Sequence, residues 1–187
     1  MTARWLVTLM LLAPGLAQAS AIHLQATDGT CHLNITPTQP TGVFTILADA
    51  TASCGCVNGA EFRVAGLGSG WFVTVTASPG AALAIGDPLG AGCNIALSSC
   101  STPGPALLYT IGLTYLAGGD PPATTLHVEA HSTPSHPAFA CPVVTADTGI
   151  IFCRECATSG VLYINNPGDC TVGTRAATWS QVKALLR

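Results

Sequence analysis

Charged residues are scarce in this sequence, and the scarcity excludes several classes of protein. Asp, Glu, Lys and Arg make up 8% of the 187 residues, and Lys183 is the only lysine. Phosphate binding depends on clustered Lys and Arg, so we do not expect nucleic acid as a partner. General acid–base and nucleophilic catalysis draw mostly on ionisable side chains, so their short supply also argues against an enzyme.

Beyond its N-terminus the chain lacks an apolar run of the roughly 18 to 20 residues that cross a bilayer. The N-terminus itself has the pattern of an export signal: Arg4, the apolar stretch 5–12 and the small-residue motif Ala17-Gln18-Ala19. We therefore predict a signal peptide over residues 1–19 and a protein secreted to the periplasm or the extracellular space. The segment from Ser20 carries 5 basic and 9 acidic groups, a formal charge of −4.

Helical periodicity is nearly absent, and short β-prone runs alternate with turn-forming Gly, Pro, Asn, Asp and Ser. A spacing near ten residues is typical of an antiparallel sandwich. The predicted strands are residues 22–26, 31–35, 43–48, 60–65, 71–77, 93–97, 106–116, 126–131, 149–153 and 161–164. The sequence thus predicts an all-β fold, an antiparallel β-sandwich forming a single domain over residues 20–187.

One helix is predicted, at the C-terminal end over residues 178–187. Trp179, Val182 and Leu186 share one face at helical spacing, and Lys183 and Arg187 complement the C-terminal end of the helix dipole. An isolated helix of this length is marginal in water, so we expect it to dock on the sandwich.

Nine cysteines follow the predicted signal, at positions 31, 54, 56, 93, 100, 141, 153, 156 and 170. In an exported protein they are expected to form disulfides. The odd number requires one cysteine to be free or to link two molecules in a disulfide-bonded dimer.

Sequence spacing predicts a set of pairs. The predicted pairs are Cys93 with Cys100, Cys156 with Cys170, Cys141 with Cys153, and Cys31 with Cys54 or Cys56. Crowding of cysteines two residues apart predicts that one of Cys54 and Cys56 is unpaired.

Two other cysteine chemistries are less well supported. Cys54-x-Cys56 and Cys153-x-x-Cys156 resemble two halves of a zinc site, but the first spacing is atypical and the chain is predicted to be exported. Cys153-Arg154-Glu155-Cys156 also has the spacing of a thioredoxin-type pair. That chemistry needs the first cysteine at a helix N-terminus, whereas a β-prone run precedes Cys153.

The best candidate for a functional cluster is His127, Glu129 and His131. At positions i, i+2 and i+4 of a strand, all three would share one face and could hold a metal ion. An ordinary solvent-facing strand accounts for the same pattern more simply. We therefore predict no catalytic residue, no cofactor and no metal, and keep a metal-binding protein or metal-dependent hydrolase built on these three residues as the alternative.

Two stretches carry a resemblance to a known family. Gly42-Val43-Phe44-Thr45-Ile46-Leu47-Ala48, followed by Gly59-Ala60-Glu61-Phe62-Arg63-Val64, resembles the early strands of cohesin-like bacterial extracellular sandwiches. Residues 93–96 and the Trp-containing tail are similar to those of exported bacterial β-sandwich proteins without an assigned function. The resemblance implies the fold class, and it does not imply dockerin binding, because the cysteines are foreign to a typical cohesin.

Together these features predict an exported, non-catalytic binding or structural module of the cell surface or extracellular space. Its partner would be a protein or a carbohydrate, contacted by loops and by exposed aromatic residues. Trp71 and Tyr109 are candidates for such contacts, and either fits the core equally well.

Overall fold

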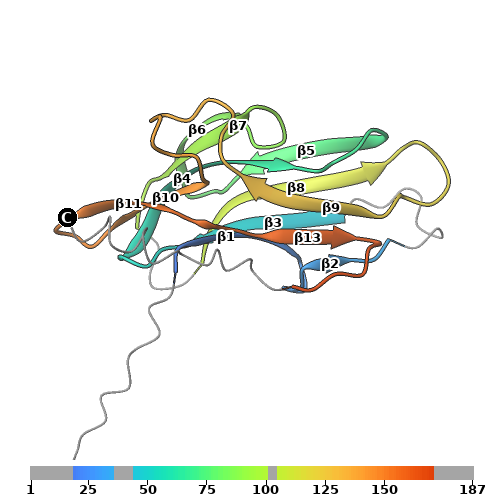
Figure 1. Cartoon of the computed structure of the whole chain (residues 1–187), viewed down its shortest axis with the longest axis horizontal. Coiled ribbons are helices and arrows are strands. Elements are labelled where there is room, and N and C mark those ends of the chain that lie inside the picture. The colour runs from blue at the N-terminus through green and yellow to red at the C-terminus, as the bar shows by residue number, and fades with distance from the viewer. Residues whose placement is uncertain (1–18, 36–43, 101–104, 171–187) are drawn as a thin grey trace, which may run out of the picture.

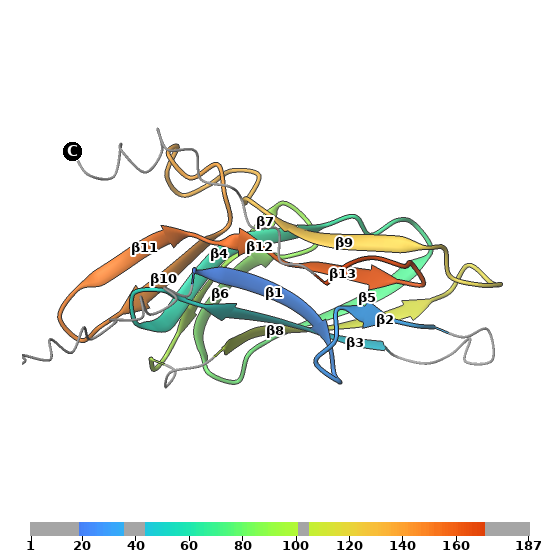
Figure 2. The ribbon, with the colours of Figure 1, turned by 60° about the horizontal axis from the view of Figure 1, so that its bottom comes forward.

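The computed structural model describes residues 19–35, 44–100 and 105–170. These residues form two β-sheets that pack against each other as a sandwich (Figure 1, Figure 2). In the described part of the chain, all regular secondary structure consists of β-strands, so the predicted all-β sandwich is confirmed. The predicted helix 178–187, and all but the last residue of the predicted signal peptide, lie outside the described residues.

Sheet one has five strands. Their order is β12 (Thr158–Ser159), β1 (Ala21–Ala26), β3 (Phe44–Thr51), β8 (Ala106–Tyr115) and β5 (Trp71–Ala77). Neighbours are antiparallel, except that β12 runs parallel to β1. The edge strand β5 pairs with β8 along its whole length, from Trp71 opposite Tyr115 to Ala77 opposite Tyr109, without a register shift.

Sheet two is built around β4 (Cys56–Ala65). On one edge of β4 lies β7 (Gly92–Leu97), which pairs in turn with β6 (Ala81–Asp87). On the other edge, β10 (Val143–Asp147) pairs with residues 56–61 and β9 (Thr124–Glu129) pairs with residues 63–65. Outside these lie β11 (Phe152–Cys156), beside β10, and β13 (Val161–Ile164), between β9 and β2 (His32–Leu33).

The strands β9 and β10 follow each other along the same edge of β4. The N–H of Val64 donates to the carbonyl of Pro88, beside β7, at 2.6 Å, which leaves the opposite edge for Val128 of β9. The chain between β9 and β10, residues 130–142, therefore has to leave sheet two at the middle of the sheet.

The core lies between the two sheets. On β4 the inward residues Ala60, Phe62 and Val64 are buried, and the Phe62 ring packs edge-on against Tyr109 of β8 with 6.1 Å between centroids. The other large side chains that are fully buried include Ile22, Ile46, Leu108, Ile111, Leu113, Leu126, Leu162 and Ile164. Burial of each contributes roughly 1.5–3 kcal/mol, so this layer is a major source of stabilisation for the sandwich.

Each of the ten predicted strands overlaps an observed one. The predictions 71–77 and 161–164 coincide with β5 and β13, whereas β9 ends at Glu129 and not at His131. The prediction missed β6, β10 and β12. Strand β6 is rich in alanine and lacks the alternation of β-branched residues that indicates a strand. Strand β12 has only two residues.

Four disulfides staple the sandwich, as predicted for the fold, but they join different partners from those predicted. The disulfides are Cys31–Cys170, Cys54–Cys153, Cys56–Cys100 and Cys141–Cys156, and Cys93 is free. None of the predicted pairings is formed.

Strand geometry explains the wrong pairings. The pair Cys93–Cys100 cannot form because β7 is extended, at about 3.3 Å per residue, and carries Cys93 into the core opposite Phe62. The register of β10 and β11 places Cys156 opposite Val143, two residues after Cys141, so Cys141 meets Cys156 and not Cys153. Cys170 lies beyond β13 and reaches Cys31, which precedes β2, the parallel neighbour of β13.

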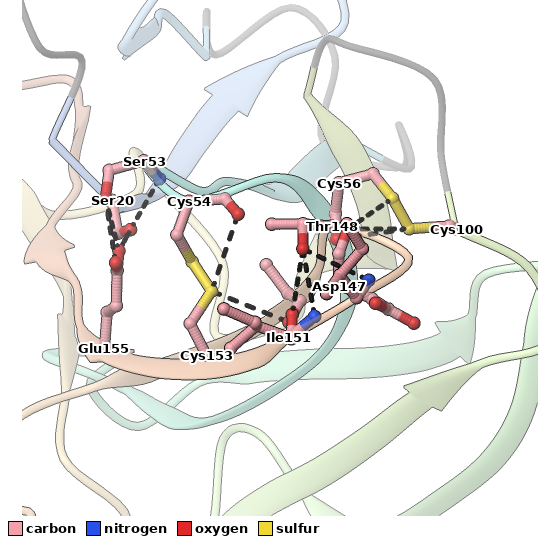
Figure 3. Close-up of a disulfide and its surroundings, with 12 residues drawn as sticks. Ser20, Ser53, Cys54, Cys56, Cys100, Asp147, Thr148, Ile151, Cys153 and Glu155 are labelled. Carbon is pink, nitrogen blue, oxygen red and sulfur yellow. Dashed lines mark hydrogen bonds between the residues drawn. A yellow bond between two sulfur atoms is a disulfide. The ribbon is translucent and has the colours of Figure 1, made fainter.

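The prediction that Cys54 or Cys56 is unpaired is also wrong. Gly55 has φ of 143°, a value that L side chains rarely adopt, and a Cβ there would lie 2.7 Å from the carbonyl oxygen of Asp147. This turn directs the two sulfurs to separate partners, Cys153 and Cys100 (Figure 3).

The same region contains a polar contact beside the disulfides. The Ser53 hydroxyl donates to Glu155 of β11 at 2.7 Å, and the hydroxyl of Ser20, just before β1, also donates to Glu155 (Figure 3). The hairpin of β10 and β11 is thus fastened to the starts of β1 and β4.

Candidate binding face

Two charged side chains of β4 point away from the core. Because side chains alternate along a strand, Glu61 and Arg63 face outward with Gly59, between the inward residues Ala60, Phe62 and Val64. We call this outer side of sheet two the loop face. It comprises Glu61, Arg63, His127, Glu129 and Arg154 together with the loop 130–142.

Glu129 is the centre of a charge cluster on the loop face. The register places Glu129 opposite Arg63, and the guanidinium of Arg63 donates to Oε2 of Glu129. The other carboxylate oxygen lies 2.7 Å from Nε2 of His127. Hydrogen bonds from His127 and then Arg63 lower the pKa of Glu129 below its ordinary value. The prediction that His127 and Glu129 share an outward face is confirmed.

His131, the third residue of the predicted cluster, does not join this pair. After β9 the chain crosses β4, and the His131 ring lies against Gly92 of β7, where a Cβ would meet the ring at 2.5 Å. Its Nδ1 accepts the N–H of Thr133 at 3.1 Å. His127 and Glu129 therefore lie together, and His131 lies apart from them, beside β7.

Among the described residues, two other groups have three possible metal ligands within 4.8 Å of one another. They are Cys31, His32 and Cys170, and Cys54, Cys153 and Glu155. In each group both cysteines belong to one disulfide, so their sulfurs are not thiolate ligands.

The loop 130–142 lies across sheet two and is held at three points. The N–H of Ser132 donates to the carbonyl of Ala91 at 2.8 Å, and the N–H of Ser135 donates to Oε1 of Glu61 at 2.9 Å. The disulfide Cys141–Cys156 fastens the end of the loop to β11. Figure 1 shows the loop on the same side of the molecule as β6 and β7. Fastened in this way, the loop presents a defined surface.

An aromatic and cationic cluster lies at the far part of the loop. The rings of His136 and Phe139 pack edge to face with 5.7 Å between centroids. The guanidinium of Arg154, from β11, lies 5.5 Å from the centroid of the Phe139 ring. A cation–π contact of this kind contributes about 0.5–1 kcal/mol at an exposed site, so Arg154 helps to hold Phe139 in place.

A cleft opens where β9 and β10 part. It has a volume of about 800 Å³, within the range of ligand sites, and Arg63, Glu129, Cys141 and Ser159 are among its lining residues. A second, smaller groove of about 210 Å³ includes Glu61 and Arg154 in its lining. The two hollows share residues with the loop face, which makes this face the best candidate for a binding site.

The loop face gathers much of the ionisable chemistry of the chain. Arg63 and Arg154 are the only Lys or Arg residues among the described residues, and both lie here. Two of the three glutamates and three of the five histidines of the sequence join them. Sequence reasoning missed the roles of Glu61, Arg63 and Arg154. The available signal was the alternation of Glu61 and Arg63 with buried residues in a chain that is poor in charge.

Burial bears on the two aromatic candidates and on the odd cysteine. Of the two alternatives for Tyr109, contact or core, the structure selects the core, since Tyr109 is 3% exposed, whereas Trp71 is half-buried against Tyr115 with 5.0 Å between ring centroids. The odd cysteine, Cys93, is fully buried, and burial raises the pKa of its thiol to about 12. A dimer linked through Cys93 would require this residue to leave the core.

No helix of the described residues is long and apolar enough to cross a membrane.

Comparisons with known proteins find likeness in structure alone. No protein-family model matches the sequence, and no curated protein matches it. A cohesin module from a family 33 glycoside hydrolase of Clostridium perfringens ATCC13124 is similar with a TM-score of 0.50, at 11% identity over 80% of this chain and 98% of that module. The seventh ScaB type I cohesin from Pseudobacteroides cellulosolvens is similar with a TM-score of 0.53, at 8% identity over 82% of this chain and 96% of that cohesin. The fold is therefore distantly cohesin-like, as residues 42–48 and 59–64 predicted.

Proposed function

We propose that this protein is an exported, non-catalytic module that binds another protein through the loop face. The observation that carries the proposal is the gathering of Arg63, Arg154 and Glu129 around a disulfide-anchored loop, in a chain where charge is otherwise scarce. Loops positioned by a rigid sheet are common binding surfaces.

Charge and shape on the loop face suit a protein segment. Arg154 and Arg63 offer donors for carboxylates or carbonyls, and the cleft of about 800 Å³ gives apolar walls from Val161 and Ala140. A polypeptide carries both charges and apolar side chains, so it can use all of these groups. The cohesin-like fold of the chain supports a binding role over a catalytic one.

Several features support the absence of catalysis. Glu129 is neutralised by Arg63 and His127, Glu61 accepts from the loop backbone, and the Cys93 thiol is buried with a raised pKa. A general base or nucleophile has to reach a substrate, and these groups are engaged by the protein itself. The metal-dependent alternative loses support because His131 lies away from His127 and Glu129.

Export is supported by the disulfides. Eight of the nine cysteines are paired, and such bonds persist in the periplasm or outside the cell rather than in the reducing cytosol. This supports a partner that is also outside the cytosol, in the periplasm, at the cell surface or outside the cell.

Site-specific photo-crosslinking tests this function. A photoreactive phenylalanine at Phe139 is compared with the same residue at Thr110, on the outer side of sheet one, in protein exposed to the secreted and envelope proteins of its host. We expect a distinct protein adduct from position 139 and its loss when Arg154→Ala is added. Adducts from position 110 alone, or a carbohydrate as the captured partner, would contradict the proposal.

A further inference from the structure

The described edge strands differ in how they are protected against pairing with another chain. Natural proteins protect exposed edges with short strands, charges or bulges. The edge strands β12 and β2 have two residues each, β11 carries Arg154 and Glu155, and β6 has a register shift and ends at Asp87. The fifth, β5, has seven residues, no charge, no proline and no register shift.

The direction of the backbone groups of β5 follows from two hydrogen bonds at its ends. The N–H of Leu116 donates to the carbonyl of Gly70, and the N–H of Ser78 donates to the carbonyl of Leu108, each at 2.8 Å. In an antiparallel pair the bonded residues alternate, so Phe72, Thr74 and Thr76 also bond to β8. The N–H and C=O groups of Trp71, Val73, Val75 and Ala77 therefore point to the open edge, where no described strand pairs with them.

We propose that β5 of one molecule pairs antiparallel with β5 of a second copy of this chain, about a twofold axis at Thr74. This register places Val73 opposite Val75 of the second copy and Trp71 opposite Ala77, so every outward backbone group of one strand meets a complementary group of the other. A register shifted by one residue would place the outward N–H and C=O groups opposite residues of the second copy whose backbone groups already bond to β8.

The side chains fit the same register. Val75 is on the inward-facing side of β5 with Trp71, Val73 and Ala77, yet it is 37% exposed because sheet one ends there. In the dimer, Val73 of the second copy covers the exposed side of Val75. On the outer side Thr74 meets Thr74, and Phe72, which is 56% exposed, meets Thr76. Aromatic to β-branched pairs and threonine pairs are favourable across strands.

Electrostatics do not oppose the pairing, since no charged residue occurs between Arg63 and Asp87. Two seven-residue strands form a small interface compared with the roughly 1,600 Å² of a standard complex. The association is therefore reversible and depends on protein concentration.

Register-specific cross-linking tests the dimer. In the proposed register the two copies of residue 74 have Cβ atoms about 4.5–5.5 Å apart, close enough for a disulfide after a small adjustment. The two copies of residue 76 are four residues out of register, roughly 13 Å apart. We expect Thr74→Cys to give a covalent dimer on a non-reducing gel, abolished by reduction, and the matched Thr76→Cys to remain monomeric. Equal cross-linking of both variants, or of neither, would overturn the proposal.

A second measurement needs no added cysteine. Sedimentation velocity of the wild-type protein is compared with Val75→Pro, which removes an N–H that points to the open edge and not to β8. We expect the wild type to shift toward a dimer as concentration rises and the variant to lose this shift. A wild type that stays monomeric, or a variant that still dimerises, would contradict β5 pairing.

Discussion

Oε1 of Glu61, at the middle of β4, accepts the backbone N–H of Ser135 at 2.9 Å, which ties the centre of sheet two to the loop 130–142. Glu61 is 6% exposed, so the loop covers a carboxylate that would otherwise face solvent. This contact joins parts of the chain 74 residues apart.

The first prediction concerns this contact. Glu61→Ala removes the acceptor for the Ser135 N–H and should cost about 1–2 kcal/mol of unfolding free energy, with faster amide hydrogen exchange over 131–136. The matched variant Glu61→Gln keeps a carbonyl acceptor and should leave exchange in the loop close to that of the wild type. Equal exchange in the loop for all three proteins would show that the contact does not hold the loop.

The second prediction concerns the anchor Cys141–Cys156, whose cysteines are 15 residues apart. Replacing both cysteines by serine should lower the unfolding free energy by about 3 kcal/mol in a denaturant titration, since the unfolded chain gains entropy. Cross-linking from position 139 should weaken as well. As a control, replacing Cys31 and Cys170 by serine should cost more stability, because the closed loop is longer, while leaving the loop face in place.

The third prediction concerns Arg154 and Phe139. A double-mutant cycle with Arg154→Gln and Phe139→Leu should give a coupling of about 0.5–1 kcal/mol in thermal or chemical unfolding. The pair Arg154 and Thr110, from different sheets, serves as the uncoupled control, with Thr110→Ala as its second variant. A coupling no larger than that of the control would mean that the cation–π contact is not formed in solution.

The fourth prediction concerns the pH dependence of stability. Burial of Asp49 raises its pKa above the ordinary value of 3.8, although the nearby His23 opposes the shift. As the pH rises above 3.8, the Asp49 carboxyl loses its proton in the unfolded chain before it does so in the folded protein. The free energy of unfolding therefore falls between pH 3.8 and the folded pKa of Asp49, and this loss remains at higher pH. Asp49→Asn should therefore be more stable than the wild type at neutral pH, and the gain should shrink as pH falls toward 3.8.

Asp28 is expected to change stability with pH in the opposite direction to Asp49, and it serves as the control for this measurement. A hydrogen bond from the backbone N–H of Thr30 lowers the pKa of Asp28 below 3.8. Its contribution to stability is present above 3.8 and is lost as pH falls through the folded pKa, so Asp28→Asn should destabilise at neutral pH and have little effect in acid. Unfolding midpoints of both variants across this pH range test the two signs together.

The fifth prediction concerns the free thiol. Because Cys93 is buried with a pKa raised to about 12, the native protein should resist alkylation by maleimide at neutral pH. Intact mass after denaturation should then show one alkylated thiol and four disulfides. Rapid labelling of the native protein, or a disulfide-linked wild-type dimer, would contradict the burial of this residue.

Local pattern explains how much of the fold could be predicted. The alternation in Thr125-Leu126-His127-Val128-Glu129 correctly indicated a strand with His127 and Glu129 outward, since the two-residue repeat depends only on neighbours in sequence. The same alternation was extended to His131, where the prediction failed. No local signal shows that the chain turns across β4 after Glu129 to reach Gly92.

The sequence by itself determined a β-sandwich stapled by disulfides, because strand periodicity, turn residues and cysteine content are properties of short segments. Tertiary structure alone decided which cysteines meet, which glutamate anchors the loop and which edge strand stays unprotected. Those outcomes depend on register between strands far apart in sequence, and a shift of one residue exchanges the two faces of a strand. For this reason Cys93, predicted to close a local loop, lies in the core, while Arg63 and Arg154, distant in sequence, lie on one outer face of sheet two.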